Sequence, residues 1–266
     1  MSTGQWKTRE ERRIDAAAKY HEVMTHAGPG PDYAYYDAGV IGFVFGEMWS
    51  RPGLTRKERR WVTLSCVAAA DATIPIQTHV YAALNSGDCT LEELDEFNLH
   101  FATQLGWPKG QNVNMYIIEA AARVASERGE PERKPSIVLW AEPTDPEARY
   151  RRGRAAFEDI MRTPSRDQET PFRTLAYLSY LYGEIWTRPV LSSKERRLIS
   201  ICCAAASNAE RELDAHLDAA LKSGDLSNSE LDEVVLHFAV YCGWLPASKL
   251  DDALTAALER ADSMEP

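Results

Sequence analysis

Apolar residues recur at helical spacing along most of the chain, and no segment shows the strand pattern of β-branched alternation between turns. The segments "RRWVTLSCVAAADA" and "RRLISICCAAASNA" are rich in alanine and small apolar residues, which predicts buried helices packed closely against their neighbours. We therefore expect an all-α fold. The predicted helices cover residues 10–26, 34–48, 55–71, 74–86, 91–105, 111–127, 147–162, 171–186, 192–208, 210–223, 228–242 and 247–262.

Local signals mark where several of these helices begin and end. Four capping boxes, each a Ser or Thr followed three residues later by Glu, predict helix starts. Gly87 and Gly224 follow apolar-periodic stretches, at the position where a glycine commonly terminates a helix. The four boxes are Thr55 with Glu58, Thr90 with Glu93, Ser192 with Glu195, and Ser227 with Glu230.

The helical pattern occurs twice in the chain. When the sequence is shifted by 137 positions, residues 45–107 match residues 182–244 without a gap, and about half of the positions are identical. Two copies of one long unit differ from the short periods of solenoid proteins and indicate a duplicated domain. The join lies in "SERGEPERKPSIVLWAEPTDP", which is rich in Pro, Glu and Arg. We predict a first unit at 1–128, a linker at 129–146 and a second unit at 147–266.

Composition narrows the class of protein. The 266 residues are 44% hydrophobic and 26% charged, as is usual for soluble globular proteins. The net charge of −10 disfavours a nucleic-acid or anionic-membrane partner. No apolar run approaches the ~18 residues of a membrane-spanning helix, and the N-terminus lacks the apolar core of a secretory signal. Five cysteines without disulfide-framework spacing favour a reducing, cytoplasmic location.

An Arg-Pro pair follows the second predicted helix of each copy, at Arg51-Pro52 and Arg188-Pro189. Proline ends the preceding helix, because the residue before it is disfavoured in the α region. The arginine then either caps the helix end, where its charge suits the dipole, or forks onto a substrate carboxylate. A pairing of Glu47 with Arg51 across one helical turn would explain both residues without a substrate.

Four of the six histidines are kept as repeat pairs, His79 with His216 and His100 with His237. His79 lies in the middle of a predicted helix beside alanines, where a histidine is either a satisfied core residue or part of a site. His100 follows Glu96 by four residues, so the two share one helix face, and the second copy repeats this pair. That spacing fits either a simple helix pair or half of a metal site, which His79 or another ligand would have to complete.

Both copies resemble the carboxymuconolactone decarboxylase family. The resemblance is carried by "GEMWSRPGLTRKERRWVTLSCVAAA", "THVYAALNSG" and "LEELDEFNLHFATQLGWP", and by the second-copy segment ending "LDEVVLHFAVYCGWLPA". It implies a duplicated all-α fold of the alkylhydroperoxidase-D type. The family assembles as trimers or hexamers, so three two-unit chains would form a six-unit ring.

The family contains thiol peroxidases and decarboxylases, and only the decarboxylase chemistry is compatible with the residues of this chain. Its thiol peroxidases use Cys-x-x-Cys, but the matching positions here are Ala72 and Pro75 in one copy and Ala209 and Glu212 in the other. Peroxide reduction by a dithiol is therefore excluded, because the reagent is missing. The other branch decarboxylates a carboxylated muconolactone without a cofactor, and its substrate is a small carboxylate or lactone.

Decarboxylation leaves a carbanion delocalised into a carbonyl, so a site must hold the carboxylate, stabilise the enolate and deliver a proton. The resemblance assigns the proton transfer to a histidine, and no metal is required. The candidate residues are His79 and His216 as general acid/base, Arg51 and Arg188 as carboxylate anchors, Glu47 and Glu184 to position these arginines, and Trp49 and Trp186 as pocket walls.

Some positions depart from the family pattern. Arg60 and Arg197 replace an acidic residue, and we expect them to be exposed at helix starts; if they point inward, they suggest a substrate with several acidic or carbonyl oxygens. The first copy has Gln104 where the second keeps Tyr241. These departures leave room for a different substrate and for a non-catalytic copy. Two alternatives remain open: a non-catalytic oligomeric ligand-binding or scaffold protein, and a metal-assisted enzyme that uses His79, His100 and Glu96 or their second-copy matches.

Overall fold

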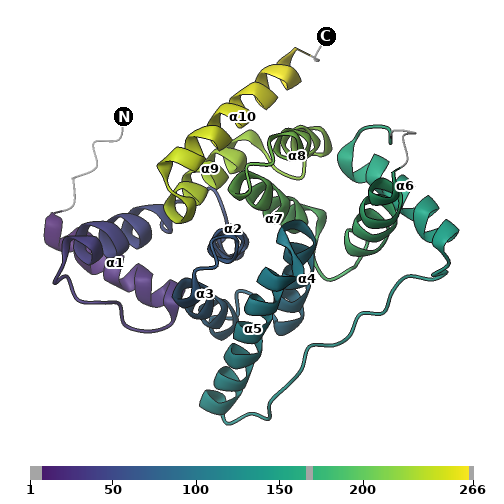
Figure 1. Cartoon of the computed structure of the whole chain (residues 1–266). Helices are drawn as coiled ribbons and strands as arrows, with labels where there is room; N and C mark the ends of the chain where they lie inside the picture. The colour runs from purple at the N-terminus through teal and green to yellow at the C-terminus, as the bar shows by residue number, and fades with distance from the viewer. Residues whose placement is uncertain (1–7, 166–169, 264–266) are drawn as a thin grey trace.

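The computed structural model describes residues 8–165 and 170–263, which form twelve helices and no strand (Figure 1). The remaining residues, including the first part of the N-terminal segment and the end of the predicted second unit, lie outside the described ranges. No described helix combines the length and the apolar character needed to cross a membrane. The helices are α1 (Arg9–Met24), η1 (Tyr35–Met48), α2 (Arg56–Ala69), α3 (Thr73–Asn85), α4 (Leu91–Leu105), α5 (Trp107–Arg128), α6 (Pro146–Met161), η2 (Phe172–Ile185), α7 (Ser193–Ala206), α8 (Glu210–Ser223), α9 (Asn228–Cys242) and α10 (Trp244–Asp262).

The predicted all-α fold is confirmed, and each predicted helix is present with ends close to those expected. All four capping boxes form, with the hydroxyl accepting from the Glu backbone and the Glu side chain accepting from the cap residue's backbone. α5 and α10 begin earlier than predicted, because Gly106 and Gly243 turn the chain directly before them at φ 102° and 89°.

Two of the predicted α-helices are π-helices, η1 and η2, whose N–H groups bond five residues back; Trp49 N–H, for example, donates to the Val44 carbonyl. Each π-helix forms a hairpin with the helix before it. In the second hairpin the backbones approach closely at Gly153, where an added Cβ would lie 1.9 Å from the Leu178 carbonyl oxygen. Glycine is therefore required at this contact between α6 and η2.

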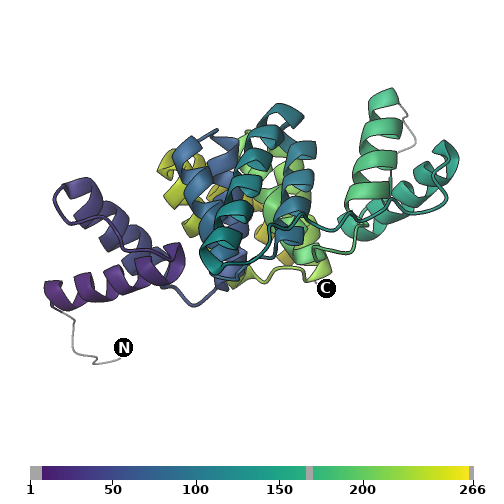
Figure 2. The same cartoon turned by 90° about the horizontal axis from the view of Figure 1, so that it is seen from below.

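The two hairpins project from opposite sides of a central helical bundle (Figures 1 and 2). The α1–η1 hairpin contacts α3 and α9, and the α6–η2 hairpin contacts α8 and α4. The segment between α5 and α6 has no regular secondary structure and runs along the outside of the molecule (Figure 1). The hairpins thus reach the bundle at helices that come from both halves of the sequence.

The two halves interlock at the centre of the bundle. α2 packs against α7 and α9, and α7 packs against α4, so each half inserts a helix beside the other half's central helix. One buried apolar core extends from Leu54 to Ala257 and takes residues from both halves. The helix order and spacing repeat along the chain, while the boundaries predicted for the two units stay a prediction.

Buried ion pairs cross between the halves at two related places. Arg196 on α7 donates to Glu96 on α4 at 3.1 Å, and Arg188 reaches the same carboxylate at 2.5 Å. Arg59 on α2 and Arg51 bind Glu233 on α9 in the same way, at 3.0 and 2.7 Å. Arg59 and Arg196 are each only 1% exposed, so their charges depend on these carboxylates.

Removing a crossing carboxylate should therefore destabilise the fold strongly. We expect Glu96→Ala to lower the free energy of unfolding by about 3–5 kcal/mol, because it leaves Arg196 buried without its counter-charge. The matched control is Glu92→Ala on the same helix, whose partner Arg133 is exposed and whose loss should cost at most ~1 kcal/mol. Urea unfolding measures both, and equal losses in the two variants would contradict the importance of the crossing pair.

Candidate functional site

The structure forms two related sites, each built from both halves of the chain. The first, here called the His79 site, combines Trp49 and His79 with two residues of α9, His237 and Tyr241. Its central helix α2 supplies Arg60, whose guanidinium lies 5.1 Å from the centre of the Trp49 ring. The site therefore exists only because α9 packs against the first half.

The second site, here called the His216 site, has the matching arrangement with the halves exchanged. Trp186 and His216 belong to the second half, and α4 of the first half supplies His100 and Gln104. Arg197 takes the place of Arg60, again 5.1 Å from the tryptophan ring. Both sites thus bring together the tryptophan and histidine that the sequence analysis selected.

In the His79 site the imidazole is enclosed by aromatic rings. It stacks on Trp49 with ring centres 6.3 Å apart, and the Tyr241 ring meets it edge-on at 5.4 Å. Trp49 Nε1 donates to the Tyr241 hydroxyl at 2.8 Å. Burial, followed by the nearby Arg60 charge, lowers the pKa of His79 to about 3, so this histidine is neutral at physiological pH.

In the His216 site the protonation of the imidazole is defined by an arginine. Arg197 Nη1 lies 3.0 Å from His216 Nδ1. Because a guanidinium can only donate, Nδ1 must accept and the ring hydrogen must sit on Nε2. Burial, and then the Arg197 charge, lower the pKa of His216 to about 3. The resting imidazole is therefore neutral, with a defined tautomer.

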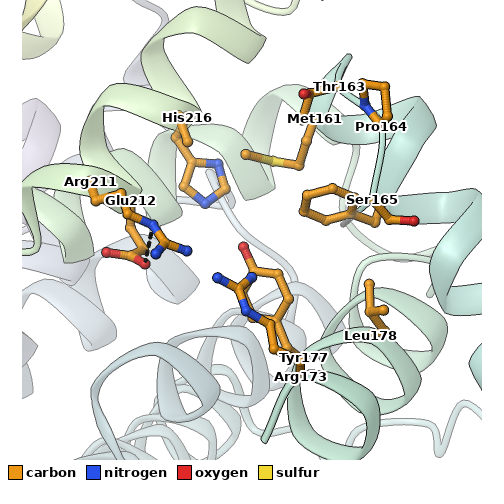
Figure 3. Close-up of a pocket in the computed structure, with 12 residues that line it drawn as sticks. Met161, Thr163, Pro164, Ser165, Arg173, Tyr177, Leu178, Arg211, Glu212 and His216 are labelled. Atoms are coloured by element: carbon orange, nitrogen blue, oxygen red, sulfur yellow. Dashed lines mark ion pairs between the residues drawn. The ribbon is translucent and has the colours of Figure 1, made fainter. Parts of the chain in front are cut away.

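A cavity of about 270 Å³ lies between the α6–η2 hairpin and α8, and His216 lines it. Figure 3 shows the imidazole facing the cavity, with the Tyr177 hydroxyl and the Arg173 guanidinium pointing toward it from the opposite wall. Arg211 lies on the same side as His216 and forms a long 3.7 Å ion pair with Glu212. This cavity combines a histidine with two cationic side chains, a composition suited to a small anion.

The expectation that Arg60 and Arg197 are exposed was wrong. Both are fully buried, because α2 and α7 lie at the centre of the bundle and are enclosed from Arg59 and Arg196 onward, after partly exposed first residues. Each is compensated by an aspartate, Arg60 by Asp88 at 3.1 Å and Arg197 by Asp225 at 3.2 Å. Burial still lowers the pKa of both guanidinium groups. Their neighbours are the site tryptophans, and Arg197 also binds the site histidine.

Arg51 and Arg188 occupy the crossing ion pairs with Glu233 and Glu96. The sequence analysis considered a pairing of Glu47 with Arg51, but the structure gives Arg51 a partner from the other half. Neither arginine is among the residues that line the His216 cavity. Their assignment as carboxylate anchors stays a prediction.

The two candidate glutamates lie on the hairpins. Glu184 is buried and accepts from Arg149 at 3.1 Å and from Arg152 at 2.6 Å, both on α6. Glu47 lines a groove between α1 and η1. Glu184 therefore binds α6 to η2, and the structure gives neither glutamate a direct bond to the candidate anchors.

The Glu96–His100 spacing has an explanation that the sequence analysis did not consider. Both side chains contact Arg196 of the other half, the imidazole Nδ1 at 3.4 Å from Arg196 Nη1. They lie at the His216 site, whereas His79 belongs to the other site, so the proposed metal set is divided between the two. Within the described ranges, no group of three or more His, Cys, Asp or Glu residues is arranged to hold a metal ion.

Arg173, Tyr177 and Arg211 were missed by the sequence analysis, which looked for residues kept in both copies. Shifted by 137 positions, the matches of Arg173 and Arg211 are Tyr36 and Ile74, so no repetition marks them. Comparing where the copies differ within otherwise matching helices would have drawn attention to these positions.

Comparisons with known proteins find similarity over parts of the chain. Residues 174–258 match the model of the carboxymuconolactone decarboxylase family. A 4-carboxymuconolactone decarboxylase of Acinetobacter baylyi is 41% identical over 80 residues, which are 30% of this chain and 58% of that protein. A nitrosuccinic acid decarboxylase of Metarhizium robertsii is 38% identical over 64 residues, 24% of this chain and 44% of that protein.

The chain thus spans about half the length of the curated relatives it matches. The matched region, residues 174–258, contains η2, α7 and α8, and therefore Trp186, Arg197 and His216. The second half of the chain is therefore similar to the carboxymuconolactone decarboxylase family.

Proposed function

We propose that this protein is a cofactor-independent, decarboxylase-like lyase that acts on a small carboxylated or lactone-type metabolite at the His216 site. The observation that carries the proposal is the cavity in which His216 lies close to Arg173 and Arg211. The decarboxylase names of two relatives support the reaction class. In this proposal the cavity binds the carboxylate of the substrate.

The proposed reaction needs three events at this cavity. A guanidinium of Arg173 or Arg211 holds the ionised acid, and the carbon–carbon bond to its carboxylate breaks with release of CO₂. The electron pair left behind delocalises into a neighbouring carbonyl or nitro group of the substrate. One proton then adds to the carbon, so that the carboxylate and one proton become a C–H bond and CO₂. The cationic wall lowers the energy of the charge that develops on oxygen.

His216 is the proposed source of that proton. Its free form is neutral because its pKa is about 3, and a bound carboxylate beside it favours the protonated form. Substrate binding is thus coupled to uptake of one proton on Nδ1, which replaces the hydrogen bond that Nδ1 accepts from Arg197 in the free protein. Since Nδ1 faces Arg197, Nε2 is the nitrogen that delivers the proton to carbon. Delivery leaves the neutral ring with its hydrogen on Nδ1, and the resting tautomer returns when this proton is lost to water and another adds to Nε2.

We expect the purified protein to release CO₂ from 4-carboxymuconolactone or from nitrosuccinic acid, the substrates named for its relatives. His216→Ala should lower the rate at least ~100-fold, because general acid catalysis contributes about that much. The control His21→Ala changes an exposed histidine on α1 and should keep the wild-type rate. Unchanged turnover in a His79→Ala/His216→Ala double variant would remove the histidine mechanism.

The pH dependence of kcat/KM tests the proton coupling. Above the pKa of about 3, the protonated fraction of free His216 falls tenfold for each pH unit, while the substrate carboxylate stays ionised above about pH 5. We therefore expect kcat/KM to fall about tenfold per unit between roughly pH 5.5 and 8. A flat profile would contradict proton delivery by His216 and would limit its Nε2–H to hydrogen bonding.

The alternative function is a non-catalytic ligand-binding or scaffold protein of the same fold. It is supported by the replacement of the family's acidic residue by Arg60 and Arg197, which are buried within the two sites. Binding of the two probe acids without CO₂ release would favour this alternative.

We also propose that three chains assemble into a ring, as the family resemblance implies. Large apolar side chains on the surface support self-association, because such groups are commonly covered in assemblies. Light scattering of the purified protein measures the mass, and a monomer would contradict the ring. The exposed apolar residues on the second half include Phe172, Leu175, Trp244 and Leu245.

A further inference from the structure

The two sites differ most at one matched position, Tyr241 in the His79 site and Gln104 in the His216 site. In the His79 site, Tyr241 lies with its ring 5.4 Å from both His79 and His237, and its hydroxyl accepts from Trp49 Nε1 at 2.8 Å. The tyrosine thus fills the space between the two histidines and satisfies the buried indole donor. No hydrogen-bonding capacity of Trp49 is left for a ligand.

The His216 site lacks both of these features. Trp186 is only 6% exposed, and its Nε1 is buried without a hydrogen-bond acceptor in the described part of the chain. At a shift of 137 positions Trp186 matches Trp49 and Gln104 matches Tyr241, so Gln104 is the counterpart of the residue that accepts from the indole at the other site. Gln104 has no ring like that of Tyr241, and its amide makes only a long 3.5 Å contact with Ser200 Oγ. A buried N–H without an acceptor is costly, so an incoming oxygen atom would be bound there favourably.

The two sites also differ in charge, and the His216 site has more positive charge beside its histidine. Arg173 and Arg211 line the cavity of the His216 site, and the matching residues of the first half are Tyr36 and Ile74. Within the described ranges, the Arg173 guanidinium has no carboxylate partner, and it lies 4.8 Å from the centre of the Tyr177 ring. An anionic ligand is therefore attracted to the His216 site and finds no equivalent arginines at the His79 site.

We propose that Trp186 Nε1 and Gln104 form a hydrogen-bonding subsite for an oxygen atom of an anionic substrate, and that Tyr241 closes the equivalent place beside His79. Each chain then has one working site, whose specificity residue Gln104 comes from the half that does not carry the catalytic histidine. The inference rests on the proposed function for the identity of the ligand, an acid bearing a further carbonyl, carboxylate or nitro oxygen.

Indole N–H resonances in ¹⁵N-labelled protein test this subsite directly, with nitrosuccinate and the unreactive dianion succinate as probes. We expect saturating nitrosuccinate to shift the Trp186 indole resonance and to leave that of Trp49 unchanged, with one ligand bound per chain. The two resonances are assigned with Trp49→Phe and Trp186→Phe. An equal response of both indoles, or two ligands per chain, would overturn the inequality of the sites.

Ligand binding to Gln104 variants is a second test of the subsite. Gln104→Tyr should restore the indole–hydroxyl bond seen at the other site, and so weaken nitrosuccinate binding at least tenfold. The matched control Gln111→Tyr makes the same change on the exposed surface of α5 and should bind as wild type. If Gln104→Tyr does not fold, Trp186→Phe removes only the donor and should weaken binding about tenfold. Wild-type affinity in either folded variant would refute the subsite.

The outcomes separate this inference from the proposed function. A shift of the Trp186 resonance without CO₂ release would support the subsite and contradict the lyase. Release of CO₂ at the wild-type rate by Gln104→Tyr would support the lyase and contradict the subsite.

Discussion

The structure depends on two buried guanidinium groups that cannot be neutralised within their own half of the chain. Arg59 and Arg196 lie on the central helices α2 and α7, and each finds its carboxylate on a helix of the opposite half, α9 or α4. An uncompensated buried charge is among the most destabilising changes a core can suffer. The requirement therefore fixes which helices lie beside each other at the centre of the bundle. The histidines that follow these carboxylates by one helical turn are carried into place with them.

The local parts of the fold could be predicted from the sequence, because their causes lie within a few residues. The capping boxes at Thr55 and Ser192 define helix starts through bonds that span three residues. The wide π-form of η1 and η2 was not predicted, since the apolar pattern distinguishes helix from strand but not one helix type from another. The packing of α4 against α7 and of α9 against α2 was not predicted either, because these partners lie far apart along the chain. The exposure of Arg60 and Arg197 was misjudged for a related reason, because the residues that cover them, such as Val23 and Ile160, lie more than thirty positions away in the sequence.

The candidate site was predicted in part. Trp49 with His79 and Trp186 with His216 were selected separately, from different segments, and the structure stacks each pair. The arginines after the π-helices were selected on the same reasoning. They form ion pairs between the halves, and their role as carboxylate anchors stays a prediction. Repetition identifies residues that the shared fold needs, whereas the groups that give one site its own chemistry differ between copies. That distinction explains why the cationic residues around the cavity escaped notice, although Gln104 had been recognised as a departure from the pattern.

The packing of α4 and α9 against the central helix of the opposite half also constrains how such a chain changes over generations. In most tandem proteins a duplicate can decay or acquire a new task while its sister carries on, since each is a separate object under selection. Here a mutation in one half of the chain can alter the site that belongs mainly to the other half. Even a half without chemistry of its own would have to be retained, because its helix α4 or α9 contributes residues to the site of the other half.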